Sequence, residues 1–171
     1  MDKLWAPWRI DYVAKKKEQK GCIFCQAKKS VNNDYVVFKT VKSICLLNRY
    51  PYNNGHLMIC PLRHTREISE LNEVEILDIF KALNRAKALL QKVLKPQGYN
   101  VGFNLGAAAG AGVRGHLHLH IVPRWFGDTN FMPSVSTTKV ISQSLNELAR
   151  LLKNADGFGK RRPNHELLSN K

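Results

Sequence analysis

The longest regular pattern of apolar positions in this 171-residue chain lies at residues 72–95. Apolar side chains recur there near helical spacing, and the next proline is Pro96. Such a stripe predicts one long helix that packs one face on a core. A shorter helix is predicted at residues 138–153, where it closes the domain.

Five short runs rich in β-branched and aromatic residues predict strands. They cover residues 35–38, 44–47, 56–60, 99–105 and 116–122. Residues 50–55 supply the proline, asparagine and glycine of a turn, so the first three strands are expected to form an antiparallel meander. The last two strands are separated by a run of glycine and alanine at 106–112, whose backbone amides can approach a ligand closely.

Strands in a row beside one long helix indicate an α+β fold with an antiparallel five-stranded sheet. The chain contains no internal repeat, low-complexity tract or composition break. One domain is therefore expected over residues 1–155, followed by a basic C-terminal tail at 156–171.

The charge balance is strongly basic, with 27 Lys and Arg residues against 13 Asp and Glu residues and a formal net charge of +14. This charge attracts polyanions of any kind and does not distinguish a nucleotide from a nucleic acid. Much of the excess lies at residues 15–17 and 160–162, where a solvated tail is the simpler interpretation. No stretch approaches the roughly 20 apolar residues that span a bilayer, and no apolar signal-peptide block is present. A cytoplasmic protein without a membrane partner is expected.

The four cysteines are too few for a disulfide scaffold, and a reducing compartment disfavours stable bridges. Cys45 and Cys60 lie in apolar, strand-like runs and are interpreted as small core residues. Cys22 and Cys25 have the spacing of one half of a tetrahedral zinc site. Taken alone, that spacing also fits a redox pair or chance.

The densest chemical pattern is the alternation of histidine with leucine at residues 116–120. Alternate side chains of a strand point to opposite faces, so His116, His118 and His120 are expected on one face, about 6.6 Å from one to the next. A single such histidine is most simply a hydrogen-bonded, half-buried residue. Three of them on one face of an apolar strand indicate a functional site.

Two chemistries fit three aligned imidazoles. A hydrolytic metal site normally recruits carboxylates as well, and the nearest acidic residue downstream is Asp128. Alternatively, one imidazole attacks phosphorus while its neighbours orient it and bind phosphate oxygens. The second chemistry explains more of the sequence, because the amides of the preceding glycine-rich loop can bind anionic oxygens.

The segment from Asn104 to Trp125, which contains His-Leu-His-Leu-His-Ile-Val-Pro-Arg-Trp, resembles the signature of the histidine triad superfamily. Asn48 and residues 55–63 resemble the earlier nucleotide-binding strand pair of that family. The resemblance extends from about residue 22 to residue 125. It implies a sheet-plus-helix fold that forms symmetric dimers, a purine nucleotide pocket, and a covalent nucleotidyl-histidine intermediate on His118.

The same resemblance implies roles for further residues. His56 and His120 would line the phosphate site and complete the catalytic set with His118. Asn48 would bind ribose, and Asn104 would contact phosphate or the catalytic histidine. The nucleotide-binding set expected in full is Asn48, His56, Asn104, Gly110, Gly112, Val113, His118, His120 and Trp125. Trp125 is included as a base-stacking candidate, although tryptophan more often belongs to a core or a dimer interface.

A subset of triad proteins binds a structural metal through a Cys-x-x-Cys pair, a histidine after the second strand and the first triad histidine. His64 and His116 stand at the two histidine positions. The resemblance therefore implies a closed zinc site of Cys22, Cys25, His64 and His116. Such a site would attach the N-terminal segment, about residues 1–30, to the catalytic strand.

Residues 4–9 and 123–133 most resemble a branch of microbial enzymes that act on diadenosine tetraphosphate and include phosphorylases. One departure concerns the loop before the histidines. Many triad hydrolases carry a hydroxyl-bearing segment there, whereas residues 110–113 read Gly-Ala-Gly-Val. A side chain that assists the leaving group is missing, so the sequence leaves the acceptor and the leaving group open.

The leading hypothesis is a homodimeric enzyme that cleaves a dinucleoside polyphosphate through nucleotidyl-His118, with inorganic phosphate or water as acceptor. Trp5, Trp8 and the long helix are candidates for the dimer interface. A purine nucleoside phosphoramidase is the alternative within the family. A zinc-stabilised nucleic-acid-binding module is the alternative of another class, and it is not favoured because it leaves the aligned histidines unexplained.

Overall fold

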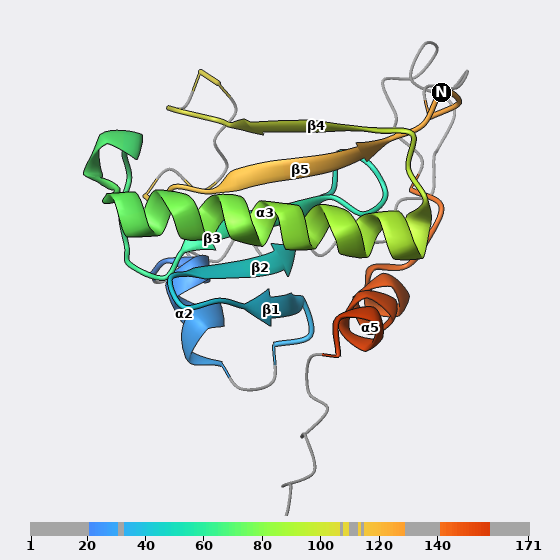
Figure 1. Cartoon of the computed structure of the whole chain (residues 1–171), viewed down its shortest axis with the longest axis horizontal. Helices are drawn as coiled ribbons and strands as arrows, with labels where there is room; N and C mark the ends of the chain where they lie inside the picture. The colour runs from blue at the N-terminus through green and yellow to red at the C-terminus, as the bar shows by residue number, and fades with distance from the viewer. Residues whose placement is uncertain are drawn as a thin grey trace, which may run out of the picture.

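The computed structural model describes residues 21–30, 33–106, 108–109, 113, 115–128 and 141–157. A five-stranded antiparallel sheet with the strand order β1-β2-β3-β5-β4 lies at its centre (Figure 1). The strands are β1 (Val36–Lys39), β2 (Ser43–Leu47), β3 (Leu57–Pro61), β4 (Gly98–Phe103) and β5 (Leu119–Arg124). The helices are α2 (Ile23–Lys29), the short 3-10 helix η1 (Ile68–Glu70), α3 (Glu73–Leu94) and α5 (Leu145–Asp156). The predicted α+β fold with a five-stranded sheet is confirmed.

The long helix α3 forms where the sequence predicts it and has a defined start. The side chain of Asn72 accepts a hydrogen bond from the backbone N–H of Glu75, and the Glu75 side chain bonds back to the Asn72 backbone. This capping box satisfies donors that the first turn leaves without partners. Lys95 ends the helix in the left-handed conformation, directly before Pro96.

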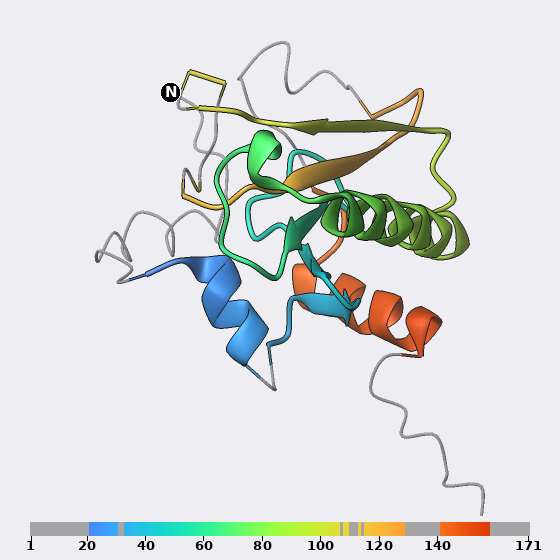
Figure 2. The same ribbon diagram turned by 60° about the vertical axis from the view of Figure 1, so that its left-hand side comes forward.

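The two faces of the sheet carry different clusters. One face packs Leu47, Ile59 and Ile121 against α3 and α5 in the main core. The other packs Ile44 and Met58 against α2. Figure 2 shows α2 and α3 on opposite faces of the sheet. Because α2 covers only the β1–β2–β3 side, the part of this second face over β4 and β5 remains for the site.

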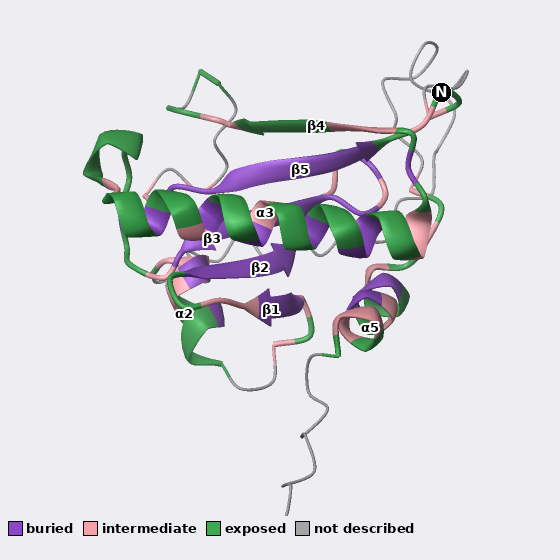
Figure 3. Cartoon of the chain, in the orientation of Figure 1, coloured by how far each residue is buried: buried purple, intermediate pink, exposed green. Residues whose placement is uncertain are grey.

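Burial is uneven among the strands. The residues of β2 and β3 are buried along their whole length, whereas most of the edge strand β4 is exposed or half-buried (Figure 3). An exposed edge strand leaves backbone hydrogen-bonding groups without strand partners. In the described part of the chain, no helix is long and apolar enough to cross a membrane.

Two predicted boundaries are wrong in ways that matter. The fifth strand begins at Leu119 rather than at residue 116, so His116 and His118 precede it. The reason is that the backbone N–H of Leu117 donates to the carbonyl of Thr65, outside the sheet ladder. The fourth strand ends at Phe103, which leaves Asn104 just beyond it.

The helices differ from the predictions at the two ends of the chain. The last helix starts at Leu145, because the Ser144 side chain caps it by accepting from Glu147 N–H, and it ends at Asp156 before the left-handed Gly157. Residues 141–144 are not helical, and 138–140 lie outside the described residues. The sequence reasoning missed α2, which carries Cys25 and follows Cys22.

One glycine fixes the turn that leads to His56. Gly55 has a φ of +77°, and a Cβ atom there would lie 2.5 Å from Cδ1 of Leu94 and 3.0 Å from Cγ of Pro123. The first contact is too short and the second is tight, so a side chain at this position would strain the backbone and force Leu94 or the turn to move. The turn and the start of β3 are thereby held at a fixed distance from β5.

Candidate functional site

Three histidines from two strand regions lie together on the sheet face away from α3. The ring centroids of His118 and His120 are 4.8 Å apart, and those of His56 and His120 are 5.0 Å apart. His120 lies directly opposite Met58 across β3 and β5, which brings His56 next to it. His116 belongs to a different group, described below. The expected row of three triad imidazoles is therefore divided between two clusters.

The hydrogen bonds of His56 determine which of its nitrogens carries the proton. The backbone N–H of Tyr52 donates to Nδ1 of His56 at 3.1 Å. The Asn48 amide nitrogen lies 3.2 Å from the same atom, and its oxygen accepts from the backbone N–H of Tyr50. Since Nδ1 accepts, the proton of neutral His56 lies on Nε2.

His120 receives the next hydrogen bond of this chain. Nε2 of His56 lies 2.8 Å from Nδ1 of His120, so the N–H of His56 donates and Nδ1 of His120 accepts. The proton of neutral His120 is then on Nε2. That atom is buried and has no hydrogen-bond partner among the described residues. A buried donor without a partner costs about 1–3 kcal/mol, and an anionic oxygen of a ligand would remove that cost.

His118 has the opposite arrangement. Its Nδ1 lies 2.8 Å from the backbone carbonyl of His116, and a carbonyl can only accept, so Nδ1 carries the proton. The lone pair is left on Nε2. One imidazole therefore offers a lone pair, while its neighbour His120 offers an N–H.

Burial keeps these rings neutral. Desolvation, followed by the neighbouring His120 and His118, lowers the pKa of His56 to about 3. Desolvation and then His118 lower the pKa of His120 to about 4. Desolvation also lowers the pKa of His118, against the opposing effect of its hydrogen bond to the His116 carbonyl. At neutral pH the described cluster can therefore supply both a nucleophilic lone pair and a neutral donor.

A second cluster, the metal cluster, consists of Cys22, Cys25, His64 and His116. Their ligand atoms all lie within 4.8 Å of one another. Sγ of Cys22 lies 3.1 Å from Nδ1 of His116, and Sγ of Cys25 lies 3.4 Å from Nδ1 of His64. Ligand atoms around a tetrahedral zinc are about 3.8 Å apart or less, so a small contraction would complete a coordination sphere.

The donor chemistry of the metal cluster fits a metal ion. Nε2 of His116 lies 2.9 Å from the carbonyl of Pro61, which fixes the proton on Nε2 and turns the Nδ1 lone pair toward the cysteines. Two sulfurs and two imidazole nitrogens form a closed set of the kind that structural zinc prefers. His118 and His120 are not part of this group among the described residues.

The remaining predicted residues are placed as follows. Asn104 lies beyond β4, and its amide nitrogen donates to the Tyr52 hydroxyl at 3.3 Å. Val113 packs against the cluster around α2. Trp125 follows the end of β5 remote from His118, so the structure does not bring it to the histidines. Gly110 and Gly112 lie outside the described residues, as do Trp5 and Trp8.

Two aromatic residues of the site were missed from the sequence. Phe24 of α2 packs on His116 and His118, with ring centroids 5.3 Å and 5.0 Å away. It lies between the metal cluster and the ring whose lone pair is on Nε2. Tyr52 packs on His56 at 4.6 Å and on His120 at 5.7 Å. Its only sequence signal is its place in the turn before His56, and such turns rarely reveal which side chain folds back.

Comparison with protein families finds a match that covers the sheet and the long helix. A family model described as the HIT domain matches residues 29–127. This span contains the three clustered histidines, His64 and His116, whereas Cys22 and Cys25 precede it.

Among curated relatives, the AP-4-A phosphorylase of Mycobacterium tuberculosis strain ATCC 25618 / H37Rv is 35% identical over 161 residues, which cover 89% of this chain and 83% of that protein. The asymmetrical bis(5'-nucleosyl)-tetraphosphatase of Schizosaccharomyces pombe is 30% identical over 89 residues, or 52% of this chain and 48% of that protein. The crystal structure of a Zn-bound histidine triad family protein from Mycobacterium smegmatis has the same fold, with a TM-score of 0.65, 24% identity, and coverage of 80% of this chain and 94% of that one.

Proposed function

This chain belongs to the HIT family of nucleotidyl hydrolases and transferases, and from that premise we propose that it cleaves dinucleoside polyphosphates through a nucleotidyl intermediate on His118. The observation that carries the proposal is the pair of opposite proton positions. His118 is held by the His116 carbonyl with its lone pair on Nε2, and the neighbouring His120 has an Nε2–H without a partner among the described residues. The names of the two curated relatives support diadenosine tetraphosphate as the substrate class.

In the first step the Nε2 lone pair of His118 forms a bond to the α-phosphorus. The bond from phosphorus to the bridging oxygen breaks, and its electrons leave with a nucleoside triphosphate. The attached imidazole becomes positively charged, and the His116 carbonyl on Nδ1–H stabilises that charge. His120 donates its Nε2–H to an oxygen of the reacting phosphate group.

In the second step an acceptor oxygen attacks the same phosphorus and the P–N bond returns its electrons to Nε2 of His118. Inorganic phosphate as acceptor gives a nucleoside diphosphate, and water gives a nucleoside monophosphate after loss of a proton. Asn48 and Tyr52 act through His56, because they hold Nδ1 of His56 as an acceptor and so direct the N–H of His56 toward His120. These hydrogen bonds do not distinguish phosphate from water as the acceptor.

We assign the metal cluster to one structural zinc ion. Bound zinc would supply a cross-link between α2, the segment after β3 and the segment before β5. It has no step in the reaction, because Phe24 lies between the metal cluster and His118. The thiols it requires agree with a cytoplasmic, reducing location, which we retain as part of the proposal.

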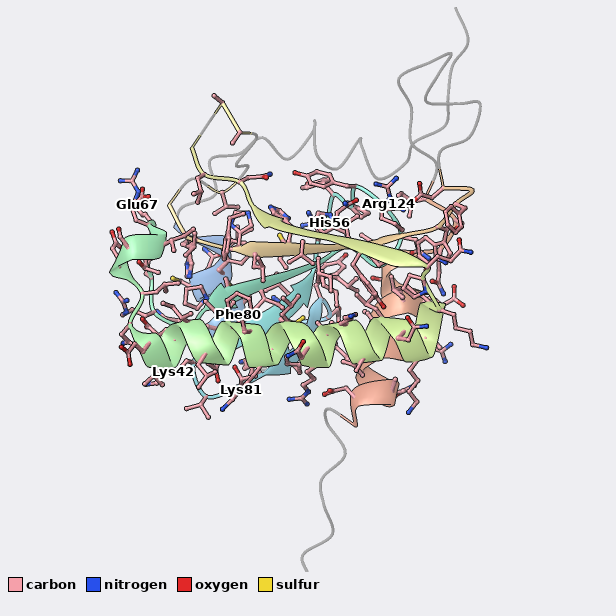
Figure 4. All side chains as sticks on the ribbon, turned by 45° about the horizontal axis from the view of Figure 1, so that its top comes forward. Lys42, His56, Glu67, Phe80, Lys81 and Arg124 are labelled. Atoms are coloured by element: carbon pink, nitrogen blue, oxygen red, sulfur yellow. The ribbon has the colours of Figure 1, made fainter. Side chains whose placement is uncertain are left out.

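We also propose that the active form is a homodimer. Four large apolar side chains are exposed on the first half of α3, and β4 presents an exposed sheet edge. They are Val74, Ile76, Leu77 and Phe80. Figure 4 shows Phe80 on α3, away from His56 and Arg124. Exposed apolar side chains on a helix, together with an exposed edge strand, are typical of a surface covered by a second copy.

Product analysis with diadenosine tetraphosphate tests the function directly. With inorganic phosphate present, a phosphorylase forms ADP and ATP; a hydrolase forms AMP and ATP with or without phosphate. The parallel assay uses an adenosine phosphoramidate, from which a phosphoramidase releases the amine. Turnover of the phosphoramidate alone, or of neither compound, would contradict the proposal.

A further inference from the structure

A cavity of about 280 Å³ lies beside the clustered histidines. It is lined by Tyr52, Asn53, Asn100, Val122 and Arg124. Alternate residues of a strand share a face, so Val122 and Arg124 continue the face that carries His120. Asn100 lies opposite Val122 on β4. The cavity therefore begins where the phosphate-binding histidine ends, on the side of His120 away from His118.

Tyr52 forms the wall that the cavity shares with the histidines. One part of its ring packs on His56 and His120, yet 53% of the residue remains exposed. Asn104 donates to its hydroxyl and fixes the orientation of the ring. An exposed aromatic ring held in place at the edge of a phosphate site is a platform on which a nucleotide base can stack.

The polar groups of the cavity suit an uncharged ligand group better than a phosphate. The guanidinium of Arg124 forms a bidentate ion pair with Asp128 at 2.6 and 3.0 Å, which neutralises much of its charge. Its Nη1 donates to Oδ1 of Asn100 at 2.7 Å. The amide nitrogen of Asn53 already donates to the Pro123 carbonyl and to Asp128, so the amide nitrogen of Asn100 and the amide oxygen of Asn53 remain for the edge of a base or for ribose hydroxyls. Figure 4 shows Arg124 and His56 on the same side of the sheet, with α3 on the other.

The volume also limits the ligand. Small-molecule pockets commonly measure about 300–1,000 Å³, so this cavity lies just below that range. It has room for one nucleoside rather than for a whole dinucleoside polyphosphate.

We propose that the cavity binds the leaving nucleoside, which is the base and sugar of the nucleoside triphosphate released in the first step. The inference rests on the proposed function. A nucleophile and a leaving group lie on opposite sides of the phosphorus, and the cavity opens beyond His120 when His118 is the nucleophile. Tyr52 and Asn100 then determine specificity, because they make the enzyme prefer a substrate with a nucleoside at both ends.

The test compares two substrates that share the reacting α-phosphorus. Diadenosine tetraphosphate has a second adenosine, and adenosine 5'-tetraphosphate lacks it. The measured quantity is the ratio of kcat/KM for the first substrate to kcat/KM for the second. We expect Tyr52→Leu to lower this ratio about tenfold, which is at the lower end of the contribution of base stacking. Asn100→Leu should lower it in the same direction and serves if Tyr52→Leu does not fold.

Tyr50→Leu is the matched control, because Tyr50 lies on the same turn and does not line the cavity. Its ratio should equal that of the wild type. An equal loss of kcat/KM for both substrates in Tyr52→Leu would overturn the proposal, because it would mean that Tyr52 acts only through His56. An unchanged ratio in both Tyr52→Leu and Asn100→Leu would also overturn it.

Failure of the proposed function gives a different result, namely a wild-type protein that cleaves neither substrate. The cavity is then tested by calorimetry on His118→Ala, with and without Tyr52→Leu. Selective weakening of diadenosine tetraphosphate binding supports the subsite, and unselective weakening or none rejects it.

Discussion

Nε2 of His56 and Nδ1 of His120 lie 2.8 Å apart, and this hydrogen bond has a direction. Because the Tyr52 backbone N–H occupies Nδ1 of His56, the proton between the two rings belongs to His56. His120 is thereby left with its own proton on Nε2, which has no hydrogen-bond partner in the described part of the chain. A backbone amide in a turn thus sets the donor character of a residue on another strand.

The first prediction separates the nucleophile from its neighbours. His118→Ala removes the atom that bonds to phosphorus and should abolish turnover while nucleotide binding persists. His120→Ala removes one donor to the phosphate and should lower kcat about 10²–10³-fold. Rapid quench with substrate labelled at the α-phosphorus, trapped in alkali, should show labelled protein in the wild type. No label should appear in His118→Ala.

Near-normal turnover by His118→Ala would show that the wrong residue has been named. Thermal melting of both variants is the control for folding, because both side chains are buried.

The second prediction concerns pH. The folded-state pKa values of His56 and His120 are about 3 and 4, whereas an unfolded histidine titrates near pH 6.5. Below pH 6.5 the histidines bind protons in the unfolded chain but stay neutral in the folded chain. The free energy of unfolding should therefore decrease as the pH is lowered. The stability of the folded state is unaffected by these histidines above pH 6.5, and it decreases from pH 6.5 down to their folded-state pKa values of about 4 and 3. Urea unfolding at pH 7, 6 and 5 measures the slope.

His56→Gln should reduce that slope, since one buried imidazole is gone. A free energy of unfolding that stays constant from pH 7 to pH 5 in the wild type would contradict the burial of neutral histidines. Working above pH 5 keeps most carboxyl titrations out of the comparison.

The third prediction is that zinc copurifies at about one ion per chain. Cys25→Ala should lose the ion and melt at a lower temperature, because binding at such a site is coupled to folding. Cys45→Ala is the matched control for zinc content and should keep the ion, since Cys45 lies in the core cluster on the α3 side and is not a member of the metal cluster. Elemental analysis that finds no zinc in wild type prepared without chelator, or unchanged zinc in Cys25→Ala, would refute the assignment.

The fourth prediction is that the protein is a dimer. Light scattering at micromolar concentration should give about twice the chain mass of 19.5 kDa. Phe80→Glu places a charge in the exposed apolar patch on α3 and should shift the mass toward the monomer. Asn146→Glu adds the same single negative charge to the exposed surface of α5, outside the patch, and is the control for the added charge alone. A wild-type mass of one chain would reject the interface.

Periodicity and turn chemistry predicted most of the fold. The long helix was predicted at residues 72–95 and spans Glu73–Leu94, with the two flanking residues as its caps. Most strand boundaries differ from the predicted ones by one or two residues, and each strand extends past its predicted run at one end, to Lys39, Ser43, Pro61, Gly98 and Arg124. The fifth strand was predicted to start three residues too early because alternation cannot reveal that Leu117 bonds to Thr65.

The candidate site was less accessible to sequence reasoning. Spacing and resemblance named His56, His118 and His120, which the structure brings together, and the four residues of the metal cluster. The resemblance also assigned His116 to the metal ligands, but the hydrogen bonds that orient the histidine rings were not predictable from the sequence. Tyr52 has its role because its ring folds back onto another strand. A linear pattern does not contain that contact.

The metal cluster also has a consequence for how the chain is made. Cys22 and His116 are 94 residues apart. A ribosome adds about 5–20 residues per second, so roughly 5–20 s separate the synthesis of the first ligand from that of the last. During this interval the thiols of Cys22 and Cys25 are present in the growing polypeptide without His116, and oxidation of the thiols competes with metal binding. With the proposed zinc as the bound metal, the order of the ligands along the chain would make biosynthesis depend on a reducing environment around the ribosome.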